Sequence, residues 1–110
     1  MEEQLELFPE LAPKAAIDQA REIIYGDREK TYGNPSRNLQ AIAEMWNAYI
    51  GVKLDRAERE GDSWFLNAKD VCALMSLLKA ARFANSPDHV DNVVDAIGYW
   101  ALVERCDATE

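Results

Sequence analysis

Apolar residues recur at intervals of three and four along four segments of the chain, which is the spacing of one helix face. The first segment begins near Pro13 and stops at Gly26. Asn34 and Pro35 are suited to the N-cap and first position of a second helix, and Gly51 is its predicted end. The apolar positions of these two helices are Ala16, Ile17, Ala20, Ile23 and Ile24, followed by Leu39, Ile42, Met45, Trp46, Tyr49 and Ile50.

Two further helices are predicted in the second half of the chain. Asn67 is placed to cap a third helix that closes near Pro87, and a fourth runs from about His89 to Arg105. Residues 52–66 are expected to connect the second and third helices and to fold back on the core, with a short charged helix as an option at 54–60. No segment alternates strictly between apolar and polar residues. The pattern therefore predicts an all-α fold, a compact bundle of about four helices.

The fourth helix is apolar around most of its circumference. Its apolar positions are Val90, Val93, Val94, Ile97, Tyr99, Trp100, Leu102 and Val103. A helix of this kind is usually buried on two sides, and one small bundle cannot cover both. We therefore expect a homo-oligomer, either a homodimer or a dimer of dimers.

Composition narrows the class of protein. The chain has 110 residues and a formal net charge of −8, and four of its twenty acidic residues lie in the first ten positions. We expect a flexible acidic tail at 1–10 and one domain at 11–110. The acidic balance argues against direct binding of nucleic acid. No leader-like start and no long apolar run are present, so a cytoplasmic protein without a membrane span is predicted. Cys72 and Cys106 are interpreted as packing thiols.

Three aspartates stand on helix faces that are otherwise apolar. Asp91 and Asp95 are four residues apart on the fourth helix, and Asp70 precedes Leu74 and Leu77 on the third. One hypothesis is that these acids converge on Mg²⁺ or Mn²⁺, because such hard ions prefer oxygen ligands. The alternative is that the helix dipole stabilises the negative charge of Asp91 in the first turn, while Asp95 and Asp70 form salt bridges with Lys79 and Arg82.

The loop before the second helix is a candidate anion site. Arg28 and Lys30 could hold phosphates beside a helix N-terminus, and Tyr32 could stack on a base. A solvated connection explains the same charges equally well. The single histidine, His89, is interpreted as a capping or loop residue, since no serine or cysteine nucleophile accompanies it.

An ordered series of residues resembles a family of small phage and prophage proteins that is usually left as a domain of unknown function. The resemblance covers about residues 15–104. Its motifs are Gly26-Asp27-Arg28, Tyr32-Gly33-x-Pro35, Trp46-x-Ala48-Tyr49, Asp70-Val71-x-x-Leu74-Met75-x-Leu77-Leu78-Lys79-x-Ala81-Arg82 and His89-x-Asp91-Asn92-x-x-Asp95-x-x-Gly98-Tyr99. This resemblance implies a phage protein and specifies no activity.

A more distant resemblance is to the all-α nucleoside triphosphate pyrophosphohydrolases of the MazG and dimeric dUTPase type. Those enzymes hold Mg²⁺ with an ExxE helix followed by an ExxD helix. Asn67-x-x-Asp70 looks like the ExxD motif with Asn in place of Glu, and Asn92-x-x-Asp95 is a second candidate. Glu44-x-x-Asn47 stands for ExxE with its second acid missing. These departures weaken the metal site unless Asp91 and Asp95 supply the missing ligands, and they would also suit a relative that binds nucleotides without cleaving them.

The acidic tail carries a short motif of its own. Gln4-Leu5-Glu6-Leu7-Phe8 resembles the pentapeptide with which bacterial proteins dock on the replicative sliding clamp, with a departure at the third position. A terminal segment can place two apolar anchors in a partner's groove. The alternative is that these apolar side chains fold back on the bundle.

Two functions follow from these resemblances. The first is a Mg²⁺-dependent or Mn²⁺-dependent nucleotide pyrophosphohydrolase that acts in nucleotide-pool control. The second is a phage protein that binds or sequesters nucleotides without catalysis, or an adaptor on the clamp. In the first, the catalytic residues would be Asp70, Lys79 and Asp95, the metal ligands Glu44, Asp70, Asp91 and Asp95, and the substrate-binding residues Arg28, Lys30, Tyr32, Arg82 and Asn92.

Overall fold

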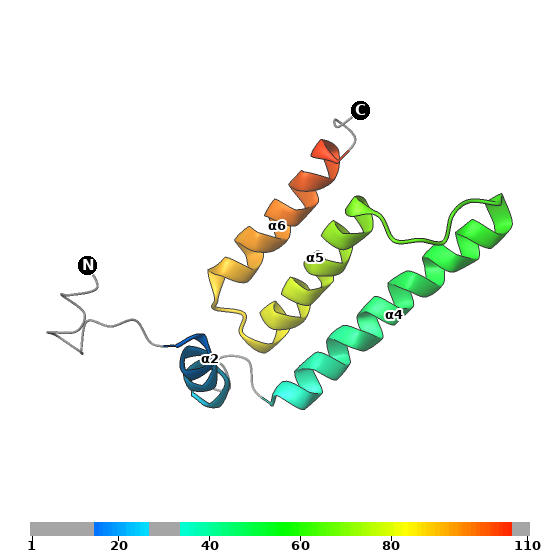
Figure 1. Ribbon diagram of the computed structural model, residues 1–110. Coiled ribbons are helices and arrows are strands. Elements are labelled where there is room, and N and C mark those ends of the chain that lie inside the picture. The colour runs from blue at the N-terminus through cyan, green and yellow to red at the C-terminus, as the bar shows by residue number, and fades with distance from the viewer. Residues whose placement is uncertain (1–14, 27–33, 107–110) are drawn as a thin grey trace, which may run out of the picture. The chain divides into compact units, whose positions relative to one another are not determined.

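The computed structural model describes residues 15–26 and 34–106, and every regular element in these two ranges is a helix. The helices are α2 (Ala16–Tyr25), α4 (Pro35–Glu60), α5 (Ala68–Asn85) and α6 (Val90–Arg105) (Figure 1). The prediction of an all-α fold with four helices is therefore confirmed. By its internal contacts the chain divides into two units, residues 1–30 and 31–110, so α2 is described apart from the other three helices.

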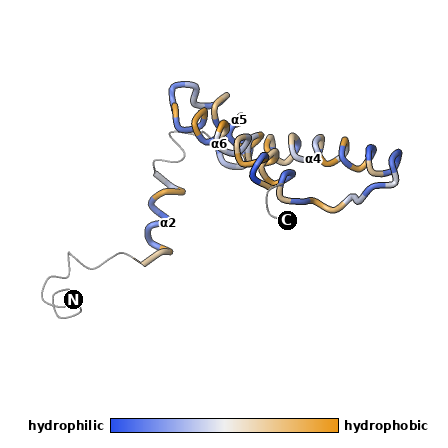
Figure 2. The backbone as a smooth tube through the Cα atoms, turned by 90° about the horizontal axis from the view of Figure 1, so that it is seen from above, coloured by the Kyte–Doolittle hydropathy of each residue, from blue (hydrophilic) through white to orange (hydrophobic). Residues whose placement is uncertain are grey.

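Helix α2 forms where the first apolar stripe predicts it. Figure 2 shows hydrophobic and hydrophilic turns alternating along it. Gly26 follows the last helical residue, and a Cβ at this position would lie 2.7 Å from the carbonyl oxygen of Glu22. Any other residue would clash with the last turn, so the predicted stop is confirmed together with its steric reason. Ile17 and Ile23 of the stripe are 70% and 52% exposed.

Helix α4 begins as predicted and ends nine residues later than predicted. The Asn34 side chain accepts a hydrogen bond from the backbone N–H of Arg37 at 3.2 Å, and Pro35 is the first helical residue. The helix continues through Gly51 and stops at Gly61, which adopts a φ of 67°. The predicted end at Gly51 is wrong because an interior glycine costs a helix only about 1 kcal/mol. The left-handed conformation of Gly61 is a much stronger stop.

The connection between α4 and α5 does not fold back on the core. Trp64 is 60% exposed, Phe65 66% and Leu66 47%, so the prediction of a packed connection is wrong. The Trp64 and Phe65 rings instead contact each other, with centroids 4.4 Å apart. Two neighbouring aromatic rings shield part of each other's surface, which lowers the cost of leaving both outside the core.

Helices α4, α5 and α6 lie side by side, with α5 in the middle (Figure 1). Among the residues that the structure describes, the buried apolar ones lie on α4 and α5 and are Ile42, Ala57, Cys72, Ala73 and Leu74. The indole N–H of Trp46 donates to the carbonyl oxygen of Leu74 at 2.7 Å and ties α4 to α5. A single layer of three helices buries only the faces between neighbours, so much apolar side-chain surface stays exposed. None of the described helices is long and apolar enough to cross a membrane.

Candidate functional site

The first turn of α5 is held by a reciprocal pair of hydrogen bonds. The Asn67 side-chain oxygen accepts from the backbone N–H of Asp70 at 3.0 Å. One carboxylate oxygen of Asp70 accepts in return from the backbone N–H of Asn67 at 2.8 Å. This is a capping box, in which two backbone donors that have no partner inside the helix are both satisfied. The predicted cap at Asn67 is confirmed, and Asp70 is part of the same device.

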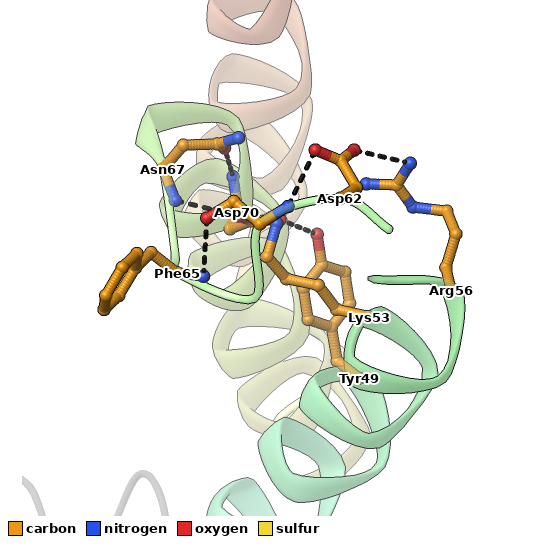
Figure 3. A network of polar contacts seen from close by, with 8 residues as sticks. Tyr49, Lys53, Arg56, Asp62, Phe65, Asn67 and Asp70 are labelled. Carbon is orange, nitrogen blue, oxygen red and sulfur yellow. Dashed lines mark hydrogen bonds and ion pairs between the residues drawn. The ribbon is translucent and has the colours of Figure 1, made fainter. Parts of the chain in front are cut away.

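Two side chains of α4 also bind the Asp70 carboxylate. The Tyr49 hydroxyl donates to one oxygen at 2.7 Å, and the Lys53 ammonium contacts the other at 2.8 Å (Figure 3). Tyr49 and Lys53 are one helical turn apart, so both reach α5 from the same face of α4. The Lys53 and Asp70 side chains are 10% and 9% exposed. The start of α5 is therefore attached to α4 by a largely buried ion pair.

The surroundings of Asp70 change the pKa values of this cluster. Burial on its own would raise the pKa of Asp70, but hydrogen bonds from Lys53, Tyr49 and the Asn67 backbone outweigh burial and hold it below its ordinary value. Burial of the Tyr49 hydroxyl, followed by its hydrogen bond to the negative carboxylate, raises the pKa of Tyr49 to about 12. At neutral pH the cluster therefore holds an aspartate anion beside a neutral tyrosine.

A pocket of about 450 Å³ opens beside this cluster, between α4 and the start of α5. Its lining consists of Tyr49, Val52, Lys53, Arg56, Asn67, Lys69 and Asp70. Three of these side chains are basic and one, Asp70, is acidic. Lys53 is paired with Asp70. Arg56 stands at the rim, where it pairs with Glu60 and Asp62 at 3.1 Å each. Pockets of this size commonly hold small organic ligands.

Sequence reasoning missed Tyr49, Lys53, Arg56 and Lys69 as pocket residues. The first three follow one another at intervals of four and three, which is the spacing of a single helix face. The predicted helix end at Gly51 separated Tyr49 from the other two and concealed that face. A continuous α4 would have identified it.

The acids predicted to hold a metal do not gather in one place. Asp95 pairs with Lys79 at 2.9 Å, as the alternative interpretation expected. Asp70 pairs with Lys53 of α4, a partner that was not predicted. Asp91 lies in the first turn of α6 with a side chain that is 78% exposed, and Glu44 is exposed on α4. In residues 15–26 and 34–106, no three His, Cys, Asp or Glu side chains form a group that could hold a metal ion.

Of the predicted substrate-binding residues, the structure describes Arg82 and Asn92. Arg28, Lys30 and Tyr32 lie outside the described residues, as does the possible clamp-binding peptide Gln4–Phe8. Arg82 is half-buried in the last turn of α5.

Asn92, a predicted substrate-binding residue, and His89, the predicted capping or loop residue, both lie near the start of α6. Asn92 is only 2% exposed, and its side-chain nitrogen has no hydrogen-bond partner, so it is a buried residue of the helix packing and not a surface contact. His89 occupies the N-cap position of α6 without a side-chain cap hydrogen bond.

Comparison with known proteins places the chain in a family. Residues 15–107 match the model of a domain of unknown function, DUF6378. This chain belongs to the DUF6378 family. The match covers all four described helices and both described ranges, and it bears out the resemblance to a domain family of unknown function. Nothing in it links the chain to MazG-type enzymes.

Two curated relatives of this DUF6378 chain come from mycobacteriophages. It is 36% identical over 95 residues to the Gene 55 protein of Mycobacterium phage L5, which covers 86% of this chain and 53% of the relative. It is 33% identical over 92 residues to the Gene 55 protein of Mycobacterium phage D29, which covers 84% and 53%. The chain thus spans about half the length of the curated relatives that it matches. No solved structure gives a significant match.

Proposed function

We propose that this chain is a phage nucleotide-binding protein and that the pocket beside Asp70 receives the phosphate end of the ligand. The observation that carries the proposal is the gathering of three basic side chains, Lys53, Arg56 and Lys69, in the lining of that pocket. A bound phosphate would compete for Arg56 with Glu60 and Asp62, which pair with it in the ligand-free chain. A nucleotide phosphate is a compact, multiply charged anion, and charge-assisted hydrogen bonds from arginine and lysine are the strongest contacts it can make.

The remaining lining residues suit the rest of a nucleotide. Tyr49 and Val52 supply an aromatic ring and an aliphatic side chain next to the basic groups. The Tyr49 hydroxyl is engaged by Asp70 at 2.7 Å, which holds the ring in one orientation. A fixed ring costs little conformational entropy on binding, so it suits contact with a base or a sugar. This arrangement favours a ligand with an anionic end and a flat or apolar end.

Binding without cleavage is the form of this function that the described residues favour. Lys53 neutralises the Asp70 carboxylate, and the other acids expected to hold Mg²⁺ do not form a group of three ligands with it. The competing function is a metal-dependent pyrophosphohydrolase, and the experiment below distinguishes the two. Phage relatives are consistent with either role, since control of nucleotide pools and capture of a nucleotide signal both act during infection.

The test is equilibrium binding of dNTPs, NTPs and cyclic dinucleotides by the full chain, with and without Mg²⁺ or Mn²⁺, while pyrophosphate release is monitored. We expect at least one of these ligands to be retained intact. Arg56→Ala should weaken its binding by about tenfold or more, since hydrogen bonds to a charged group contribute roughly 1.5–3 kcal/mol.

Arg59→Ala is the matched control. Arg59 lies one turn further along α4, pairs with Asp55 at 3.0 Å and does not line the pocket. The Arg59→Ala variant should bind the nucleotide as tightly as the wild type does. Equal losses in the two variants, or no retention of any nucleotide at millimolar concentration, would refute the proposed site. Pyrophosphate release by the wild type that requires Mg²⁺ or Mn²⁺ would replace the binding function with the hydrolase.

A further inference from the structure

Helix α6 presents two contrasting faces. One packs on α5 and contains the buried Asn92 together with the half-buried Ala96, Tyr99 and Val103. The opposite face carries apolar side chains at helical spacing, none of which is buried. These are Val90, Val93, Val94, Ile97 and Trp100, with exposed fractions of 65%, 41%, 59%, 64% and 56%. We call these five residues the outer stripe.

An apolar outer stripe is the reverse of what solvent favours. A helix at the surface of a monomer normally directs charged and polar residues outward. Helix α6 lies at the edge of the layer formed with α4 and α5, so neither of those helices covers the stripe (Figure 1). Its five side chains expose on the order of 500 Å² of apolar surface, which matches the largest patches of typical monomers, about 300–600 Å².

We infer that the outer stripe of α6 binds the same stripe of a second copy of this chain, with the two helices antiparallel. The first argument is area. A standard protein interface covers roughly 800 Å² on each partner, and the stripe supplies most of that as apolar surface before the flanking polar side chains are added. A face that meets its own copy must be complementary to itself about a two-fold axis.

The second argument is the charge at the two ends of α6. Asp91 lies in its first turn, and Arg105 lies in its last turn next to Glu104. Both residues stand along one edge of the outer stripe, because they are fourteen positions apart, close to four full turns. An antiparallel pair centred near Ile97 places Asp91 of each copy beside Arg105 of the other. The opposed helix dipoles also attract in this arrangement. In a parallel pair, Asp91 of one copy and Arg105 of the other would lie at opposite ends of the pair and could not meet.

The same centring explains the order of side-chain sizes. Residues at equal distances on either side of Ile97 meet each other across the axis, so Trp100 of one copy lies level with Val94 of the other, and Val93 lies level with Ala101. A large ring therefore meets a small β-branched side chain instead of a second ring. Large groups facing small ones are what allows two helices to interdigitate.

Sedimentation and light scattering of the full chain over a range of concentrations test the inference. The wild type should form a dimer, or an assembly built from dimers. Ile97→Glu should shift the dissociation constant at least a hundredfold toward monomer. Leu39→Glu is the matched control, because Leu39 is 60% exposed on α4 against 64% for Ile97 and lies outside the stripe. It should leave the assembly unchanged.

Charge reversal tests the antiparallel arrangement without disturbing the apolar surface. Asp91→Arg and Arg105→Asp should each weaken the dimer, and the double variant should recover most of the loss. A monomeric wild type, which would result if α2 of the same chain covered the stripe, overturns the inference. So does an Ile97→Glu protein that still dimerises, or a double variant that adds the two losses instead of cancelling them. The nucleotide assay is independent, so failure of either proposal is recognised separately.

Discussion

Replacing Asp70 by Asn tests whether this residue works mainly to hold α5 on α4. Asn is nearly the same size and retains one oxygen, but it cannot neutralise Lys53, whose side chain is 10% exposed. It also cannot accept from Tyr49, Lys53 and the Asn67 backbone with its single oxygen. Breaking a buried ion pair from one side costs about 3–5 kcal/mol because an uncompensated charge remains buried. We expect Asp70→Asn to lose about 3 kcal/mol of the free energy of unfolding.

Urea unfolding followed by circular dichroism measures this loss, which corresponds to a fall in Tm on the order of 10–20 °C for a domain of this size. Asp55→Asn is the control, since Asp55 makes a comparable contact with Arg59 at 3.0 Å but is 68% exposed. Exposed pairs contribute about 0–1 kcal/mol, so the control should lie near the wild type. Adding Lys53→Met to Asp70→Asn should restore part of the stability, because the second change removes the unpaired charge.

The pH dependence supplies a further check on the same carboxylate. The pKa of Asp70 is lowered in the folded protein, so its contribution to stability is present above the ordinary aspartate pKa of about 3.9. It is lost as the pH falls through the lower value of the folded state. The difference between wild type and Asp70→Asn should therefore stay constant from pH 7 to about 5 and shrink below about 4. A variant within about 0.5 kcal/mol of the wild type at pH 7 would refute the structural role and return Asp70 to the list of candidate metal ligands.

Two local predictions concern the ends of α4 and α5. Asn67→Ala removes the side-chain half of the capping box and should cost about 1 kcal/mol in urea unfolding, whereas Asn67→Ser should cost less because serine also caps helices; equal losses would show that the cap is not the cause. Gly61→Ala should cost about 1 kcal/mol because the φ of 67° is unfavourable for a residue with a Cβ, and Gly51→Ala inside α4 should instead stabilise the protein. Identical effects of these two substitutions would contradict the assignment of Gly61 as the helix stop.

The local signals in the sequence were sufficient for the helices themselves. Asn34 with Pro35, and Asn67 with Asp70, act within three residues of each other, so their caps can be read from the chain and are found in the structure. Gly51 led to the wrong helix end because its local cost was considered without the residues that follow it. Glycine destabilises a helix, but oppositely charged residues four positions apart stabilise it. Such pairs follow Gly51 in the sequence, for example Arg56 with Glu60, and they favour continuation of α4.

The partners of charged residues were beyond what the sequence could decide. Asp70 lies on an apolar background in α5, and its pattern alone is compatible both with a metal ligand and with an ion pair. Its partner Lys53 is on another helix and seventeen residues earlier, and nothing in the spacing of either residue indicates the other. Electrostatic energy depends on distance in space and on burial, and both arise only when α4 packs on α5.

The sequence alone established the all-α class, the four helices and most of their ends, because helix periodicity and capping depend on residues a few positions apart. Packing of α4 on α5 decided that Asp70 is an ion-pair partner and that a basic pocket forms beside it. The position of α6 at the edge of the layer decided that its excess of apolar residues faces outward. Neither result is contained in local periodicity, since a pocket and an exposed face are properties of surfaces that belong to several helices at once.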